Sequence, residues 1–428
     1  MNFDPEAYFN GLNMFGIRLG LDATRELARR CGNPERKLNF IHLAGTNGKG
    51  STGAMLECAL RRAGLKTGFY TSPHLVYLRE RFRIAGRAVG EERFRRAASE
   101  IAQASANASF SYFETATVLA AKLFAEENCD VVVWETGMGG RLDATNIVTP
   151  VASVITNIAF DHMRALGNTL AAIAGEKAGI VKPHVPVFVG VMPDEPRLVI
   201  EKRARELDAP CFGPGEPEPA HAQLRSDGDG RVRQCFEYAG RHIELPLLGR
   251  MQRRNFRVVF AVLRELAPRL GFDLETALAG LRDTRWPARF QQVDPGLIVD
   301  GAHNPDGIAA LLEALAEVRP GEKFPVIYAA FKDKHVEHCL PELSRIAAHF
   351  YFTPLAAEGR DSFSGAELGE LLRRWSDVPF TPCADAAEAL RRAKAENPDR
   401  TVLSAGSLYL AGEVLSSAAP PAAVLDLD

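Results

Sequence analysis

The chain has 428 residues and a formal net charge of −3, with 46% hydrophobic and 25% charged residues. This composition is typical of a globular protein of about two domains. The near-neutral charge excludes the concentrated basic surface of a nucleic-acid-binding protein. No apolar run reaches the roughly 18–20 residues that cross a bilayer, so we expect no membrane association.

The start of the chain and its cysteines indicate a compartment. The first residues, MNFDPEAYFNG, carry acids where a secretory signal is basic. Seven cysteines lie singly between Cys31 and Cys383 without CxxC spacing, which argues against a zinc site and a disulfide framework. We therefore expect a cytoplasmic protein.

The first half of the chain alternates apolar runs with helical segments. Strands are predicted at residues 40–43, 67–70, 131–134, 152–155 and 187–189. Continuous apolar runs of this kind are typical of a parallel sheet covered on both faces. Helices at 53–63 and 113–127 have the length of crossover connections. The predicted fold class is α/β, beginning with a doubly wound ATP-binding domain built on a phosphate loop.

The second half predicts two further units. Turn-rich segments flank strands at 232–238 and 242–245, which indicates a small β-subdomain over about 213–246. After helices at 251–267 and 274–281, a second series follows, with strands at 297–299, 326–328, 349–352 and 401–403 and helices at 307–318 and 386–397. This series predicts a smaller, Rossmann-like α/β domain.

These patterns set the expected domain boundaries. The ATP-binding domain spans residues 1–288, and the C-terminal domain spans 297–415. A hinge at 289–296 joins them, within the irregular stretch WPARFQQVDPG, and an Ala/Pro-rich flexible tail covers 416–428.

The strongest motif is AGTNGKGST, residues 44–52, between a predicted strand and a helix. Its glycines allow backbone N–H groups to surround phosphate oxygens. Lys49 can reach the β- and γ-phosphates, and Ser51 or Thr52 can offer a hydroxyl to Mg²⁺. The spacing departs from GxxxxGK[ST] because Gly50 separates Lys49 from Ser51. A ligand-free tight turn is the alternative, but the strand and helix on either side favour nucleotide binding.

Other candidate residues follow later strands. Glu135 ends a very apolar strand, so we interpret it as a Mg²⁺ ligand or a cap. His162 is a metal ligand, a general base or a structural residue. By spacing alone, Ser72 marks a turn and Lys177 is a solvated helical lysine. In DGAHNP, Asn304 can cap a helix, whereas Asp300 and His303 are harder to explain structurally.

Taken together, the motifs resemble a known family. AGTNGKGST, YTSPHL, ETGMGGRLDATN, DH, EKAGI, GRMQRRN, WPARF, DGAHNP and AGSLYLAGE follow one another as in folylpolyglutamate synthase/dihydrofolate synthase, of the Mur ligase superfamily. The resemblance covers nearly the whole chain. It implies a monomeric, ATP-dependent amide ligase that adds L-glutamate to dihydropteroate, to the γ-carboxyl of reduced folates, or to both. An acyl phosphate would be the intermediate, and ADP and phosphate the products.

The resemblance also implies roles for individual residues. Lys49, His162 and Lys177 would be catalytic, with Lys177 carbamylated, and Asp143 would bind the pterin. Two Mg²⁺ ions would be held by Ser51, Ser72, Glu135, His162 and Lys177. ATP would be bound by Gly45, Thr46, Asn47, Gly48, Lys49, Gly50, Ser51, Thr52, Asn255, Arg289, Asp300, His303 and Asn304.

The chain departs from the family pattern at two positions. Ala288 replaces the glycine of the usual WPGR, and His335 replaces the final aspartate of DKD. The alternatives are another Mur-type amino-acid ligase, a non-catalytic ATP-binding module and a generic P-loop ATPase. The phosphate loop begins at Gly45, which leaves no room for the extra N-terminal domain of other Mur ligases. The sequence leaves open which pterin is used; Asp143 favours a bifunctional enzyme.

Overall fold

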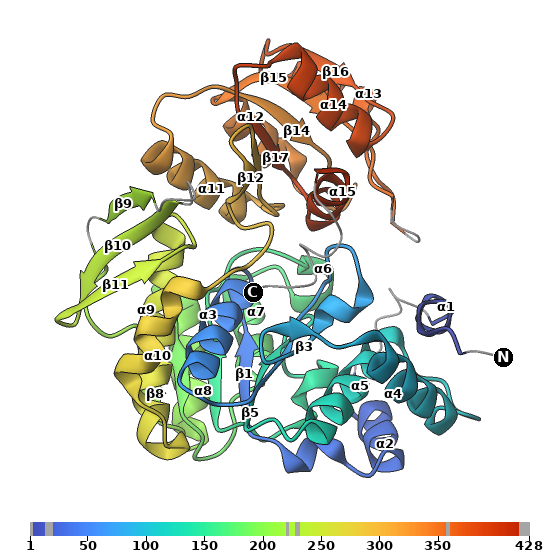
Figure 1. Cartoon of the computed structure of the whole chain (residues 1–428), viewed down its shortest axis with the longest axis vertical. Coiled ribbons are helices and arrows are strands. Elements are labelled where there is room, and N and C mark those ends of the chain that lie inside the picture. The colour runs from blue at the N-terminus through green and yellow to red at the C-terminus, as the bar shows by residue number, and fades with distance from the viewer. Residues whose placement is uncertain (1–2, 13–19, 220–221, 227–231, 357–359, 419–428) are drawn as a thin grey trace.

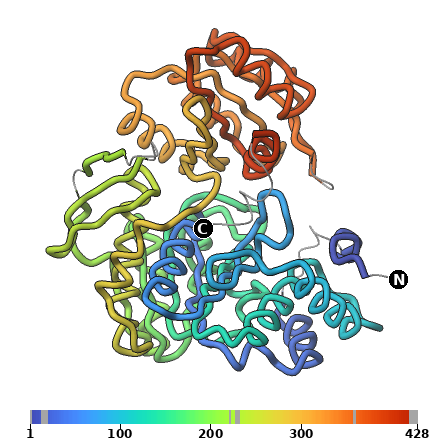
Figure 2. Tube along the Cα trace, viewed as in Figure 1, coloured from blue at the N-terminus to red at the C-terminus, as the bar shows by residue number. Residues whose placement is uncertain are grey.

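The computed structural model describes residues 3–12, 20–219, 222–226, 232–356 and 360–418 (Figure 1). It contains an eight-stranded sheet, a three-stranded sheet and a six-stranded sheet. In Figure 2 the chain runs from the large N-terminal part through the small sheet into the C-terminal part. Among the described residues, no helix is long and apolar enough to cross a membrane.

The N-terminal sheet has the strand order β4-β3-β2-β5-β1-β6-β7-β8. Its strands are parallel apart from the edge pair β3 and β4, and the five predicted strands form its centre. The strands are β1 (Phe40–Ala44), β2 (Thr67–Tyr70), β3 (Phe82–Ile84), β4 (Arg87–Ala88), β5 (Val131–Glu135), β6 (Ala152–Ile155), β7 (Val187–Val189) and β8 (Cys211–Phe212).

Helices cover both faces of this sheet. They are α1 (Pro5–Asn10), α2 (Asp22–Arg30), α3 (Lys49–Arg62), α4 (Glu91–Ala104), α5 (Tyr112–Glu126), α6 (Met163–Leu166), α7 (Leu170–Ala178) and α8 (Asp194–Glu206), with short 3-10 helices at Pro34–Lys37, Leu78–Arg81 and Ala144–Ile147. Val131 and Val133 pack with α3, whereas Val132 and Trp134 pack with α2 and α5. Burial on both faces explains why the strands are continuously apolar.

The helix α3 begins at Lys49, four residues before the predicted start at 53. Gly48 precedes it in the left-handed conformation, with φ of 83°. The chain therefore turns directly from the phosphate loop into the helix, and Lys49 lies in the first helical turn.

The small sheet is antiparallel, in the order β11-β10-β9. Its strands are β9 (Gln223–Ser226), β10 (Val232–Tyr238) and β11 (Arg241–Leu245), of which β9 was not predicted. The rings of Phe236 and Tyr238 lie 5.3 and 5.2 Å from Phe256 of helix α9 (Arg250–Leu270). Helix α10 (Leu274–Gly280) and a 3-10 helix (Leu281–Asp283) follow.

The C-terminal sheet has the order β12-β13-β17-β14-β15-β16, and only β12 is antiparallel. Its strands are β12 (Gln291–Asp294), β13 (Leu297–Val299), β14 (Phe324–Tyr328), β15 (Ala347–Phe352), β16 (Phe380–Pro382) and β17 (Val402–Ala405). Its helices are α11 (Pro305–Val318), α12 (Val336–Ser344), α13 (Gly365–Leu372), α14 (Ala386–Glu396) and α15 (Leu408–Ala418). The three sheets confirm the predicted α/β fold class.

The connection between the two large sheets differs from the expected hinge at 289–296. Residues 291–294 form β12, which pairs with β13 and so belongs to the C-terminal sheet. Before it, the Trp286 ring lies 5.3 Å from Phe69 and beside Gly50 of the phosphate loop. Ala288 is fully buried with φ of 55°, in the left-handed region.

The expected tail at 416–428 is also partly corrected, because α15 continues to Ala418. Residues 419–428 lie outside the described part of the chain. The remaining domain limits stay predictions.

Candidate active site

A cavity of about 980 Å³ lies between the N-terminal and C-terminal sheets. Loops that follow β1, β5, β6, β13, β14 and β17 line it. The structure brings almost all predicted site residues to its wall; the exceptions are Thr52 and Asn304. Those that line it are Gly45, Thr46, Asn47, Gly48, Lys49, Gly50, Ser51, Ser72, Glu135, Asp143, His162, Lys177, Asn255, Arg289, Asp300 and His303.

The phosphate loop is held tightly against its neighbours. The Lys49 ammonium donates to the Gly45 carbonyl at 3.0 Å, so its charge lies over the loop. A Cβ atom on Gly48 would lie 2.7 Å from the Asn255 amide oxygen. A Cβ on Gly45 would collide with Thr156. Glycine is therefore required at both positions, where the backbone approaches other chain segments closely.

The Glu135 carboxylate lies in a costly place. It is buried at the end of β5, and its Oε2 accepts from the Thr71 hydroxyl at 2.5 Å and the Ser72 amide at 3.3 Å. Burial raises the pKa of Glu135, and the charge of Lys49 opposes that rise. A carboxylate at this depth calls for a cation beside it.

Two serine hydroxyl groups line the same cavity as the Glu135 carboxylate. Ser51, in the first turn of α3, is buried, and its Oγ has no hydrogen-bond partner among the described residues. Ser72 lines the same cavity. Thr52 is also buried without a partner for its hydroxyl, but it does not line the cavity.

His162 faces the cavity from the loop after β6. Its backbone is left-handed, with φ of 51°, and its side chain remains 41% exposed. Desolvation by the cleft walls lowers the pKa of its imidazole, and the neighbouring Asp161 acts in the opposite direction. A neutral imidazole is the form that binds a metal ion.

Lys177, read from spacing as a solvated lysine, is in fact buried on α7. Its Nζ donates to the Gly45 carbonyl at 2.9 Å. Burial, reinforced by the charge of Lys49, lowers the pKa of Lys177 to about 7. The lowered pKa favours the neutral, nucleophilic form of the amine relative to an exposed lysine.

The Asp143 carboxylate accepts hydrogen bonds from backbone amides of its own loop. It caps the 3-10 helix Ala144–Ile147, and its carboxylate accepts from the Thr145 amide at 3.0 Å and the Met138 amide at 2.8 Å. Through the bond to Met138, Asp143 holds the part of the loop that lines the cavity.

The second wall of the cavity comes from the C-terminal part. The Asp300 carboxylate accepts from the backbone amides of Phe290 at 2.7 Å and Ala302 at 2.8 Å. Burial raises the pKa of Asp300, and the charge of Arg289 opposes it. The Nδ1 of His303 lies 2.9 Å from the Gly301 carbonyl oxygen.

Asn304, which we expect to contact the nucleotide, has a side chain that joins the two walls. It caps α11 by accepting from Gly307 at 2.8 Å, and its Nδ2 donates to the Asn47 amide oxygen at 3.1 Å. Asn47 also donates to Asp306 at 2.7 Å. The side-chain amides of Asn47 and Asn304 therefore form hydrogen bonds with each other.

Several cavity residues received no role from the sequence. Asp161 and Lys334 meet at 2.9 Å across the cavity, which Phe113 and Arg360 also line. Asp161 adjoins His162 in the DH motif, and Lys334 lies in the motif that resembles DKD, so their surroundings in the sequence were the available signal.

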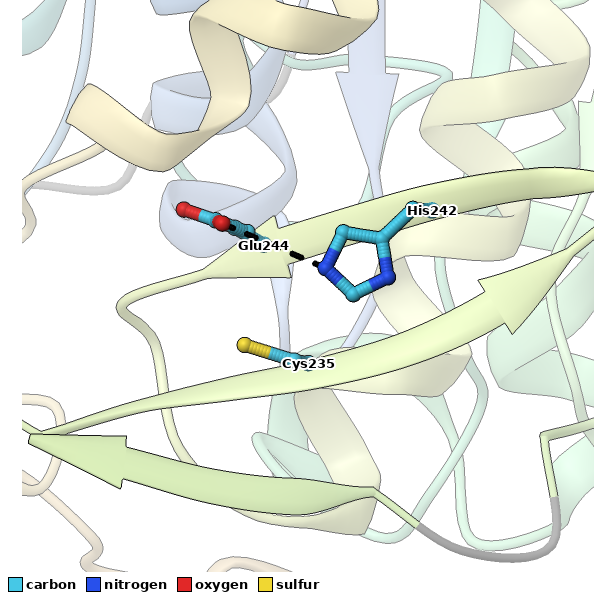
Figure 3. A group of neighbouring side chains, drawn as sticks. All are labelled: Cys235, His242 and Glu244. Carbon is cyan, nitrogen blue, oxygen red and sulfur yellow. Dashed lines mark ion pairs between the residues drawn. The ribbon is translucent and has the colours of Figure 1, made fainter.

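A different group of possible metal ligands lies outside this cavity. Cys235, His242 and Glu244 lie on one face of the small sheet, with ligand atoms within 4.8 Å of one another (Figure 3). His242 already pairs with Glu237 at 2.9 Å and Glu244 with Arg233 at 3.3 Å. Because these ion pairs occupy two of the three ligands, we assign no metal to the group.

The chain is similar to known proteins along nearly its whole length. Residues 43–263 match the Mur ligase middle domain, and residues 288–408 match the Mur ligase, glutamate ligase domain. The dihydrofolate synthase/folylpolyglutamate synthase of Bacillus subtilis is 32% identical over 96% of this chain and 97% of its own. Its Escherichia coli counterpart is 33% identical over 96% and 93%.

Solved structures show the same likeness. The Mycobacterium tuberculosis folylpolyglutamate synthase complexed with ADP superposes with a TM-score of 0.85, at 27% identity and 96% coverage of both chains. Escherichia coli FolC in complex with DHPP and ADP gives a TM-score of 0.81, at 32% identity, covering 96% of this chain and 95% of its own. The similarity therefore includes both walls of the cavity.

Proposed function

Because this chain belongs to the dihydrofolate synthase/folylpolyglutamate synthase family of Mur ligases and is a glutamate ligase of dihydropteroate or folates, we propose that it accepts both pterins and works through an acyl phosphate. The observation that carries this proposal is the cavity itself. One chain supplies both walls, with the phosphate loop on one and Asp300 and Arg289 on the other. A monomer is therefore sufficient.

ATP binds with its phosphates over the loop between β1 and α3. The N-terminus of α3 and the loop amides favour the phosphate charge there, and Lys49 adds a full positive charge. The Asn255 side chain packs against Gly48. Arg289 and Asp300 contact the nucleotide from the opposite wall of the cavity.

The residues present fit Mg²⁺. The site offers a buried carboxylate at Glu135, an unpartnered buried hydroxyl at Ser51, the Ser72 hydroxyl and the His162 imidazole. The three oxygen donors suit Mg²⁺, which keeps waters and phosphate oxygens among its ligands, and the imidazole adds a nitrogen donor. When bound, the ion supplies positive charge that stabilises phosphoryl transfer.

Lys177 completes this set if it is carbamylated. Its neutral amine is the form that attacks carbon dioxide, and the pKa of about 7 makes that form available. The resulting carbamate replaces a positive charge with a negative one. That change removes the repulsion between Lys177 and a metal ion and creates a second carboxylate-like ligand.

The chain's residues promote two successive displacements. A carboxylate oxygen of the acceptor attacks the γ-phosphorus of ATP, the bond to the bridging oxygen breaks, and ADP leaves. Lys49 neutralises charge on the transferred group. The neutral amine of glutamate then attacks the acyl carbon, the carbon–oxygen bond to phosphate breaks, and phosphate leaves with the proton from nitrogen.

Water must be kept from the acyl phosphate, which hydrolyses readily. The cavity walls meet where the Asn47 side chain forms hydrogen bonds with the side chains of Asn304 and Asp306. Enclosure between two domains excludes solvent and holds the amine close to the acyl carbon.

The proposed position of the pterin acceptor is beside Gly137 and Met138. The half-buried ring of Phe113 lies next to Gly137, and Arg81 lines the same cavity. A flat heterocycle stacks on an aromatic ring, and Asp143 fixes the loop that faces it. A free carboxylate pointing towards the phosphate loop is common to dihydropteroate and folates, which supports use of both.

The test is phosphate release from Mg-ATP and glutamate by the purified protein. Dihydropteroate, tetrahydrofolate or neither is added. Release with each pterin supports the bifunctional proposal, and release with one alone restricts the enzyme to that reaction. If neither pterin stimulates release above the background, the proposal fails.

A further inference from the structure

The Asp161 carboxylate is the meeting point of three side chains from the opposite wall of the cavity. It belongs to the loop after β6 in the N-terminal part. Lys334 Nζ lies 2.9 Å from its Oδ1, and Asn304 Nδ2 and His303 Nε2 lie 3.3 and 3.6 Å from its Oδ2. These partners come from two loops of the C-terminal sheet, one after β13 and one after β14.

This contact is shielded from solvent. The side chains of Asp161 and Lys334 are 12% and 11% exposed, unlike the exposed ion pairs elsewhere on the surface. The Asp161 carboxylate pairs with the Lys334 ammonium, so the hydrogen bond between them is charge-assisted.

The same carboxylate fixes the loop that carries His162. Its Oδ1 accepts from the His162 backbone amide at 2.9 Å, where the chain adopts its left-handed turn. A side chain that accepts within its own turn stabilises that conformation. Asp161 thus contacts both the backbone of a proposed metal ligand and the C-terminal loops.

We propose that Asp161 is a positioning residue that holds the His162 loop in register with Lys334, His303 and Asn304 of the C-terminal domain. The inference rests on the proposed function, because it assigns the residue a part in assembling that active site. Asp161 itself does not act on substrate, since its oxygens are occupied by His162, Lys334 and Asn304.

The arrangement predicts coupled effects of the two partners. Asp161→Asn keeps the shape of the side chain but removes its charge, and Lys334→Met removes the other charge. A misplacement of about 1 Å in an active site costs on the order of 10²-fold in rate. Each single variant should therefore lose about 10²-fold in kcat, and the double variant should lose no more than either alone.

The experiment combines this double-mutant cycle with two readouts that need no turnover. ADP binding is measured by calorimetry, and amide hydrogen exchange is measured in residues 300–304 and 331–335. We expect exchange in both segments to accelerate in Asp161→Asn, and ADP affinity to fall by no more than about tenfold, because the phosphate loop is unchanged while the segment that carries Asp300 loosens. Lys394→Met, which breaks a more exposed ion pair with Asp294 outside the cavity, is the control for the loss of a lysine ion pair.

The outcomes separate the two proposals. Multiplied losses near 10⁴-fold in the double variant, or unchanged exchange in Asp161→Asn, would overturn the positioning role. A wild-type protein that releases no phosphate with any pterin would overturn the proposed function, while the exchange experiment would still decide whether Asp161 holds the two domains in register.

Discussion

The Nζ atom of Lys177 lies 2.9 Å from the carbonyl oxygen of Gly45, so a buried lysine is attached to the phosphate loop. Helix α7 and the loop between β1 and α3 therefore meet beside the proposed phosphate site. This contact joins two motifs that lie 132 positions apart in the sequence.

Replacing Lys177 tests this relationship. We expect Lys177→Ala to lower turnover by about 10³-fold or more, because the variant lacks the side chain that we propose as a carbamylated metal ligand. The measurement is pterin-dependent phosphate release. Lys182→Ala, on the same segment but outside the cavity, is the control and should keep most of the activity. Near-normal turnover of Lys177→Ala would contradict the assignment.

Glycine at position 48 is required by contact as well as by conformation. We expect Gly48→Ala to weaken ADP binding at least about tenfold, because its methyl group would lie 2.7 Å from the Asn255 side chain and its φ of 83° strains an L-residue. Gly64→Ala has a similar φ of 95° without any atom within 4 Å. It should reduce stability but leave ADP affinity unchanged in calorimetry, and equal losses in both variants would refute the contact argument.

The left-handed backbone of Ala288 is strained, and its side chain is buried in the C-terminal core. We expect Ala288→Gly to change the free energy of unfolding by less than about 0.5 kcal/mol, because release of about 1 kcal/mol of left-handed strain offsets a buried methyl worth about 0.8 kcal/mol. Ala59→Gly, equally buried but within α3, should cost about 1–2 kcal/mol. Urea unfolding compares the two, and equal losses would show that Ala288 is unstrained.

His42 makes stability depend on pH. Burial lowers the pKa of His42 from 6.5 to about 3, and its Nε2 lies 2.9 Å from the Thr145 hydroxyl. Below pH 6.5 the unfolded chain binds a proton that the folded chain excludes, so stability falls as pH decreases towards 3. From pH 7 to pH 5 this group should remove about 2 kcal/mol.

The measurement is urea unfolding of the wild type and His42→Gln at both pH values. The variant should lose less stability on acidification by about that amount. His338 is exposed, so His338→Asn is the control, and its stability should fall on acidification as much as that of the wild type. An identical pH dependence in His42→Gln and the wild type would count against a neutral buried His42.

The central fold could be predicted because its strands are buried on both faces and read as continuous apolar runs. The edge strands could not: β9 (QLRS) is exposed along its length, β12 (QQVD) is short and largely polar, and β16 (FTP) is short and has no buried residue. At an edge, pairing is decided by the neighbouring strand rather than by burial of the strand's own side chains.

The candidate site followed from motifs at strand ends, because the carboxyl ends of parallel strands meet at one edge of a sheet. Burial could not be read in the same way. Lys177 looks like a solvated helical lysine until α7 is packed against the phosphate loop. The contact between Asp161 and Lys334 joins residues 173 positions apart and depends on how two sheets face each other.

The packing of Trp286 gives the protein an optical signal of its own. The chain has three tryptophans, of which Trp134 is fully buried and Trp375, in the C-terminal part, is 40% exposed. Trp286 lies beside Gly50 of the phosphate loop. Nucleotide binding should therefore change the fluorescence emission of Trp286 while that of Trp134 and Trp375 stays constant. Binding can then be followed without any label.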